Sequence, residues 1–109
     1  MLSEIMIKYF KVQISATSKD EAKSILRMLV EKKMVAGGKY QLANSIHWRE
    51  GKIDEEEYYV ISAFMLDSKK DQIIKEVTKV HSDQVPVIHY YHIDHGNQSF
   101  LDWIEKNVE

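Results

Sequence analysis

Apolar and polar residues alternate near the start of the chain, and this pattern predicts a first β-strand. In residues 9–15, Phe10, Val12 and Ile14 occupy every second position, as in a strand with one buried face. Ser18 followed by Glu21 is typical of a capping box, and apolar residues then recur at helical spacing. A helix is therefore expected over about 19–34, with Gly37-Gly38 as its stop.

The middle of the chain predicts a β-hairpin. Aromatic and β-branched residues fill 40–49 and 56–66, and Glu50-Gly51-Lys52 between them is typical of a turn. Both faces of the second strand are largely apolar, which indicates a strand that is central in its sheet or covered by a partner.

The last third predicts a helix, a strand and a terminal helix. Ser68 with Asp71 repeats the cap signal, and apolar spacing continues to about His81. Pro86 opens a strand over 87–93, and a helix over 97–108 follows, in which Trp103 is expected in the core.

The order β-α-β-β-α-β-α predicts the fold class. Its first six elements are those of the α+β, ferredoxin-like split βαβ sandwich, a four-stranded antiparallel sheet with two helices on one face. The length of 109 residues suits a single domain over 1–109. A content of 44% hydrophobic residues excludes a disordered chain.

Charge and cysteine content remove several classes of function. A net charge of −2 provides no basic field for nucleic acid. We find no signal peptide around Glu4 and no membrane span, so a cytoplasmic location is expected. The absence of cysteine excludes disulfides, thiolate metal sites and cysteine nucleophiles.

Histidines are the candidate metal ligands, because imidazole suits copper and zinc. The candidates are His81, His89, His92 and His95. His89 and His92 are three residues apart and so point to opposite faces of a regular strand. They form either a weak surface or inter-subunit metal site or a set of structurally neutral side chains. No cofactor other than copper or zinc is predicted.

Other polar and aromatic groups allow two interpretations each. The acidic run 54–57 either attracts hard cations or is a solvated hairpin paired with Arg49 and Lys52. The tyrosines at 58, 59, 90 and 91 either line a small-molecule pocket or pack in the core or an interface. Trp48 is expected at a subunit contact. The sequence contains no recognisable nucleophile with its base, paired-carboxylate site or phosphate loop, so a binding protein is predicted rather than an enzyme.

Three stretches of the chain match the motifs of a known family. They are SKDEAKSILRMLVEKKMVAG at 18–37, SIHWREGKI at 45–53 and HGNQSFLDWI at 95–104. Together they resemble the CutA family of divalent-ion-tolerance proteins. The residues matched in the hairpin, before the last strand and in the C-terminal motif are Ser45, Gly51, Lys52, Pro86, Gly96, Leu101 and Trp103. The resemblance implies a ferredoxin-like fold, a tight homotrimer and a role in divalent metal ion tolerance.

The cysteine and glutamate among the family's copper ligands are replaced in this chain. Copper-binding members use a cysteine, a glutamate and a histidine, and the matching positions fall in 15–17, at or beside Tyr59, and at Val80 or His81. The resemblance therefore implies weak binding of copper or another divalent cation. The alternative is a small-ligand sensor that uses inter-subunit clefts, as PII-like trimers do, and the ligand itself is not predicted.

Overall fold

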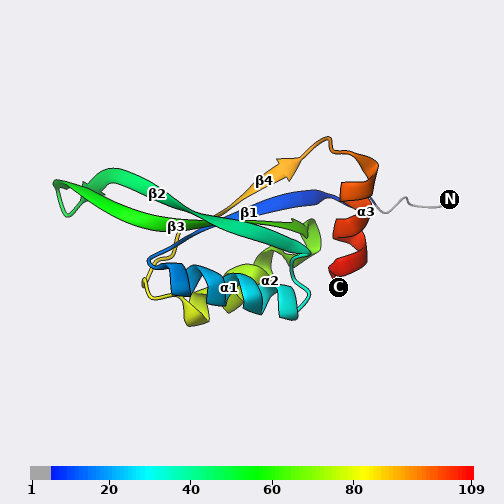
Figure 1. The fold of residues 1–109 in the computed structure, drawn as a ribbon, viewed down its shortest axis with the longest axis horizontal. Coiled ribbons are helices and arrows are strands. Elements are labelled where there is room, and N and C mark those ends of the chain that lie inside the picture. Colours follow the sequence, from blue (N-terminus) through cyan, green and yellow to red (C-terminus); the bar gives the residue numbers. More distant parts are fainter. Residues whose placement is uncertain (1–5) are drawn as a thin grey trace.

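The computed structural model describes residues 6–109, and its elements follow the expected order (Figure 1). The strands are β1 (Tyr9–Ala16), β2 (Gly37–Arg49), β3 (Lys52–Leu66) and β4 (Ile88–Ile93). The helices are α1 (Lys19–Glu31), α2 (Lys70–Val80) and α3 (Gln98–Asn107), with a 3₁₀ turn at Asp67–Lys69 before α2. The prediction of no signal peptide around Glu4 falls in residues 1–5, outside the described residues.

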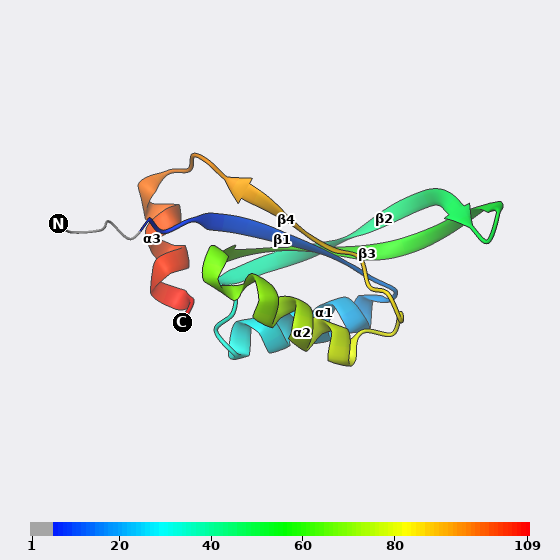
Figure 2. The same cartoon turned by 180° about the vertical axis from the view of Figure 1, so that it is seen from behind.

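The four strands form one antiparallel sheet in the order β2-β3-β1-β4, and the α+β, ferredoxin-like prediction is confirmed. Helices α1 and α2 lie side by side on one face, and the other face is open except at one end, where α3 packs on it (Figures 1 and 2). Val12 and Ile14 of β1 and Ile61 of β3 are fully buried against Ile25 and Leu29 of α1. The alternation seen in the sequence therefore places the core between the sheet and the helices.

Helix α1 ends earlier than predicted, and the glycines after it have a different role. The helix ends at Glu31, Lys33 has a left-handed φ of 58°, and the Met34 N–H bonds to the Leu29 carbonyl. This is a Schellman-type end that contains no glycine. Gly38 instead lies in β2, where an added Cβ would sit 2.3 Å from the Ser62 carbonyl oxygen. The expected glycine stop is wrong because close strand packing also requires glycine.

Strands β2 and β3 form a hairpin that extends past the helices, so the molecule measures 57 × 26 × 25 Å (Figure 1). Arg49 pairs with Lys52, which leaves a two-residue loop of Glu50 and Gly51 with φ values of 51° and 78°. Two positive φ angles are the mark of a type I′ turn, whose twist matches that of the strands.

Helix α3 packs at the opposite end of the sheet from the hairpin loop (Figure 2). Phe100 meets Phe64 edge-on with ring centroids 5.0 Å apart, and Ile104 is fully buried. The prediction that Trp103 is a core residue is wrong, because 40% of it is exposed. Its ring lies at the rim, stacked on Phe100 and so close to Gly37 that a Cβ there would be 2.9 Å away.

Candidate functional site

Six side chains gather on the open face of the β2–β3 hairpin, and we call them the hairpin polar cluster. They are Ser45, His47, Arg49, Asp54, Glu56 and Tyr58. The strand register places His47 opposite Asp54 and Ser45 opposite Glu56. Because directly opposed residues of an antiparallel pair share a face, two alternating strand sequences bring these groups together.

Arg49 contacts most of the cluster. Its Nη2 lies 2.9 Å from Glu56 Oε2 and 3.0 Å from the Tyr58 hydroxyl, and its Nε lies 3.5 Å from Asp54 Oδ2. The Tyr58 hydroxyl also donates to Glu56. These contacts, the Tyr58 hydrogen bond first and then the charge of Arg49, hold the pKa of Glu56 below its ordinary value. The Tyr58 hydroxyl and the Arg49 guanidinium therefore favour the ionised form of Glu56.

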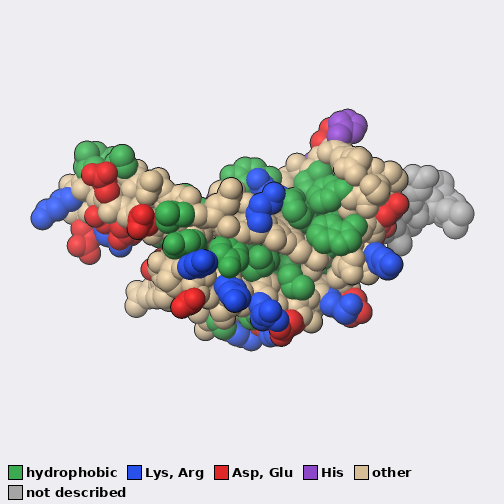
Figure 3. Space-filling view, viewed as in Figure 1, with side chains coloured by type: hydrophobic (Ala, Val, Ile, Leu, Met, Phe, Trp, Pro, Cys, Tyr) green, Lys and Arg blue, Asp and Glu red, His purple; other side chains and the backbone are tan. Residues whose placement is uncertain are grey.

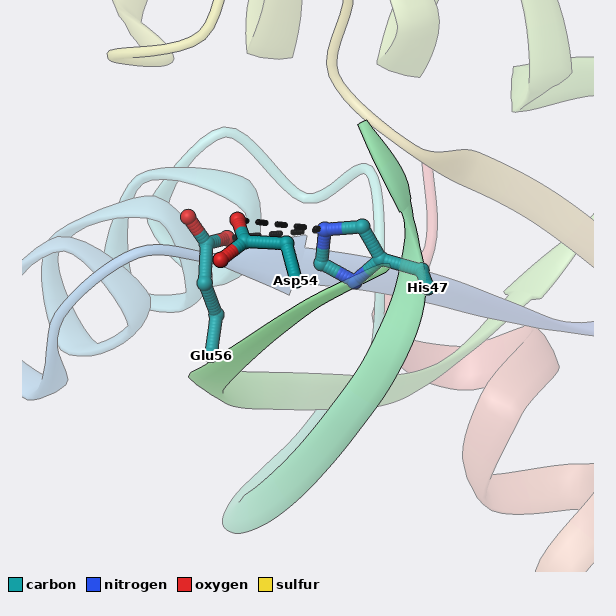
Figure 4. Close-up of side chains that lie close together, drawn as sticks. All are labelled: His47, Asp54 and Glu56. Atoms are coloured by element: carbon teal, nitrogen blue, oxygen red, sulfur yellow. Dashed lines mark ion pairs between the residues drawn. The ribbon is translucent and has the colours of Figure 1, made fainter. Parts of the chain in front are cut away.

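His47 faces the two carboxylates across the hairpin (Figure 4). Its Nε2 lies 3.9 Å from Asp54 Oδ2 and 3.9 Å from Glu56 Oε2. Its Nδ1 lies 2.9 Å from Ser45 Oγ. Among the residues that the structure describes, these three are the one group of His, Asp or Glu side chains close enough to share a metal ion.

A cavity of about 630 Å³ lies beside the cluster, between the hairpin and the segment before β4. Ser45, His47 and Arg49 line one side of it, and Asp83 and Val85 line the other. Its lining is thus mixed, with polar groups that come mostly from the cluster. Tyr58 lines this cavity, as the pocket interpretation expects, whereas Tyr59 and Tyr90 pack against the core.

His81 is enclosed at the end of α2, and both of its ring nitrogens are hydrogen-bonded. Nε2 lies 2.7 Å from the Ser15 carbonyl oxygen, and Nδ1 accepts from the Asp83 N–H at 3.0 Å. The side chain is fully buried. A ring with both nitrogens engaged has no free lone pair for a metal ion, so we do not retain His81 as a ligand.

Glu21 joins the same junction from the first turn of α1. Its carboxylate accepts the backbone N–H groups of Thr17 and Ser82 at 2.9 and 2.8 Å. Burial raises the pKa of Glu21, but these hydrogen bonds outweigh it and hold the pKa below its ordinary value. The contacts therefore tie the end of β1 to the segment after α2.

The other three candidate histidines do not converge. The register pairs His89 with Gln13 and His92 with Phe10, which places the two imidazoles on opposite faces of the sheet. His92 packs against the Phe10 ring, and His95 follows β4 with its side chain 95% exposed. Within residues 6–109 they form no common ligand group with one another or with His81.

Sequence comparison identifies the family. The family model for the CutA1 divalent ion tolerance protein matches residues 10–107 of this chain. The chain belongs to the CutA1 family.

Individual relatives agree with this assignment. The divalent-cation tolerance protein CutA of Archaeoglobus fulgidus is 34% identical over 98 residues, which is 90% of this chain and 96% of that protein. A structure of CutA from A. fulgidus, described as a periplasmic divalent cation tolerance protein, superposes with a TM-score of 0.88 at 33% identity and covers 95% of this chain and all of that one. The Thermus thermophilus protein gives a TM-score of 0.87 at 25% identity, with the same coverage.

The residues matched to the CutA motifs fall into two groups in the structure. Ser45 belongs to the hairpin polar cluster, and Gly51 and Lys52 form the end of the hairpin. At the other end, Gly96 lies against Phe100 and Leu101, where a Cβ would be 3.3 Å from each side chain. Pro86 precedes β4 and is half-buried. The motif residues thus shape the two ends of the molecule.

The positions matched to the CutA copper ligands lie close together here. Ala16 pairs with Tyr59 across the sheet, and His81 reaches the Ser15 carbonyl. Hydrogen bonds within the chain already engage the histidine, and neither alanine nor serine offers a strong ligand. The group of His47, Asp54 and Glu56 is a different one. Sequence reasoning missed it because it considered the acidic run with Arg49 and Lys52 and not with His47.

Proposed function

We propose that this CutA1-family chain is a homotrimer that takes part in divalent metal ion tolerance and binds copper, zinc or another divalent cation weakly. One observation carries the assembly part of this proposal. Apolar side chains continue along the helix-covered face of the hairpin beyond the helices. This hairpin apolar stripe consists of Leu42, Ile46, Trp48 and Ile53, and between 51% and 73% of each residue is exposed.

A row of large apolar residues on a projecting hairpin supports contact between copies of the chain. Figure 3 shows hydrophobic side chains on this projection, away from the main body. Exposed apolar surface of this kind is typical of protein interfaces. The sheet also has two outer strands, β2 and β4, whose open edges favour pairing or covering by a neighbour. A closed trimer would bury the apolar stripe and also cover the open edges of β2 and β4.

The family and the chemistry of the chain support cation binding. The relatives from A. fulgidus and T. thermophilus are named as divalent cation tolerance proteins. With no cysteine in the chain, nitrogen and oxygen atoms must supply the ligands, which favours a modest affinity. Binding through histidine weakens as the pH falls through about 6.5, because imidazolium has no lone pair for a metal.

Light scattering and calorimetry test the two parts of this proposal. The expected mass is three times 12.8 kDa at micromolar protein concentration. Calorimetry with Cu²⁺ and Zn²⁺ should show binding at about pH 7.5 that weakens at about pH 5.5. A stable monomer would contradict the assembly, and no heat from either ion would contradict the binding.

The comparisons do not favour the PII-like alternative, and a thermal-shift panel separates the two. Stabilisation by Cu²⁺ or Zn²⁺ is expected, whereas stabilisation by nucleotides or metabolites would indicate a small-ligand sensor. We expect binding without catalysis.

The cytoplasmic location stays a prediction, since the A. fulgidus structure is described as a periplasmic protein. Within residues 6–109 no helix is long and apolar enough to cross a membrane. Fractionation of cells that produce the protein would decide the compartment.

A further inference from the structure

We propose that His47, Asp54 and Glu56 form a divalent transition-metal site on the hairpin, and that Arg49 competes with the metal for it. This inference takes from the proposed function only the kind of ion, a divalent cation. It assigns that ion to ligands other than the candidate histidines of β4, and it does not depend on the trimer.

The three groups have the composition and spacing of a ligand set. They offer one imidazole nitrogen and two carboxylate oxygens, and these atoms all lie within 4.8 Å of one another. Zinc bonds of about 2.0–2.1 Å place neighbouring ligand atoms roughly 3.3 Å apart in a tetrahedron. The 3.9 Å separations from His47 Nε2 therefore need to shorten by only roughly half an ångström, which side-chain rotation supplies.

Ser45 and Arg49 together define the protonation of His47. A guanidinium only donates, so His47 Nε2, 3.3 Å from Arg49 Nη2, is the acceptor and carries the lone pair. Nδ1 then bears the proton and donates it to Ser45 Oγ at 2.9 Å. This is the tautomer that a metal-bound histidine needs, with its second nitrogen held by a neighbouring oxygen.

Arg49 takes the place that a cation would occupy between these ligands. Its guanidinium contacts all three candidate ligands, at 3.3 Å for His47, 3.5 Å for Asp54 and 2.9 Å for Glu56. One positive charge leaves one formal negative charge of the two carboxylates unbalanced, whereas a divalent ion would neutralise both. Binding is therefore an exchange in which the flexible arginine leaves and the ion enters.

The donor set and the exposure point to the kind of ion. Imidazole favours zinc, copper(II) or nickel over calcium and magnesium, which prefer oxygen ligands alone. The side chains of His47, Asp54 and Glu56 are 27%, 39% and 34% exposed, so an ion can reach them from solvent. With three protein ligands, one coordination position remains for water.

Calorimetry with ZnCl₂ on the full chain tests the proposal through three variants. His47→Gln should weaken binding by about tenfold or more, because an imidazole ligand is lost. Arg49→Gln should strengthen it about two- to fivefold, the range expected when a partly exposed ion pair no longer competes. Lys52→Gln is the matched control. It removes the same charge from the residue paired with Arg49 and should change the affinity by less than about twofold.

The outcomes separate this proposal from the broader one. If wild-type protein binds Zn²⁺ and only His89→Ala/His92→Ala/His95→Ala abolishes binding, this site is overturned and weak cation binding stands. Equal gains for Arg49→Gln and Lys52→Gln would overturn the competition by Arg49. If neither wild type nor Arg49→Gln binds Zn²⁺ or Cu²⁺, this site and the cation-binding part of the broader proposal both fail. A ¹⁵N shift of His47 Nε2 on addition of Zn²⁺ would support the site directly.

Discussion

His81 illustrates how a histidine can be used entirely for structure. Its buried ring joins the Ser15 carbonyl to the Asp83 N–H. We predict that His81→Leu lowers the free energy of unfolding by about 1–3 kcal/mol, because two polar backbone groups lose their partner. Urea unfolding measures this change.

His95→Leu is the control for His81, because its side chain is 95% exposed and its loss should cost less than about 0.5 kcal/mol. Similar costs for the two variants would contradict the structural role of His81. A fold that stays intact while zinc affinity falls would make His81 a ligand after all.

Glu76 contributes stability that depends on pH. Hydrogen bonds from Lys32 and then Lys79 lower its pKa from 4.5 to about 2. A carboxylate with a lowered pKa stabilises the fold above its unfolded pKa, and this contribution is lost as the pH falls toward the folded value. We therefore predict that the stability difference between wild type and Glu76→Gln is constant above about pH 5 and disappears between 4.5 and about 2.

Urea unfolding of both proteins across this range tests the Glu76 prediction, and an NMR titration of the Glu76 side chain gives its pKa. Because both lysines are partly exposed, 1 M salt should reduce the difference. A titration midpoint close to 4.5 would show that the two lysines do not hold the carboxylate in solution.

At the residue scale, the sequence did not predict which side chains meet at the hairpin site. The sequence predicted the hairpin and noted Arg49 beside the acidic run, but it placed a turn at 50–52 and began the second strand at 56, whereas β3 begins at Lys52. The loop has two residues, and a change of one residue in register moves every side chain to the opposite face. Only the correct register places His47 beside Asp54 and Glu56, so the site depended on a turn length that the sequence left open.

At the element scale, the end of α1 offers a stabilising substitution. Lys33 adopts φ 58°, a conformation that costs a residue with a Cβ about 1–2 kcal/mol. Glycine removes that cost and adds backbone entropy of about 0.5–1 kcal/mol to the unfolded chain. Lys33→Gly should therefore raise the free energy of unfolding by about 0.5–1 kcal/mol.

Lys33→Ala is the matched control. It also removes the exposed ion pair with Glu109, but it keeps the Cβ and so should give no gain. Thermal unfolding of the three proteins measures the effect. An equal rise for both variants would show that the gain comes from the lost lysine side chain and not from relief of the backbone.

Element types were readable because one face of each element is buried. The alternation of apolar and polar residues predicted β1, and apolar residues at helical spacing predicted α1 and α2. The exceptions have local causes. Gly37 and Gly38 resemble a helix stop but belong to β2, because Trp103 and the Ser62 carbonyl leave no room for a side chain. Trp103 and Ile104 are neighbours in an amphipathic pattern, and only the docking angle of α3 decides which is buried.

At the scale of the whole molecule, the hairpin apolar stripe should decide the state of assembly. We predict that Ile46→Asp disrupts the proposed trimer, because a carboxylate would be transferred from water into an apolar contact. Sedimentation velocity at micromolar concentration should then show a species near 12.8 kDa.

Asn44→Asp is the control for Ile46→Asp, since it adds the same charge to the same face two residues away. It replaces a residue that is already polar, so the trimer should persist. If both variants remain trimers, the stripe lies outside the interface between copies. If both dissociate, charge repulsion and not apolar contact is the cause.

The order of the sheet also has a consequence for how the chain folds. Strands β2 and β3 meet across a two-residue loop, whereas β1 pairs with β4 through Tyr9 and Ile93, near opposite ends of the chain. Closing a long loop costs more entropy than closing a short one, so local contacts form first. The hairpin should therefore gain amide protection early in refolding, and the edge strand β4 should join last. During that interval the second edge of β1 is open to other chains, so refolding at high concentration should compete with aggregation.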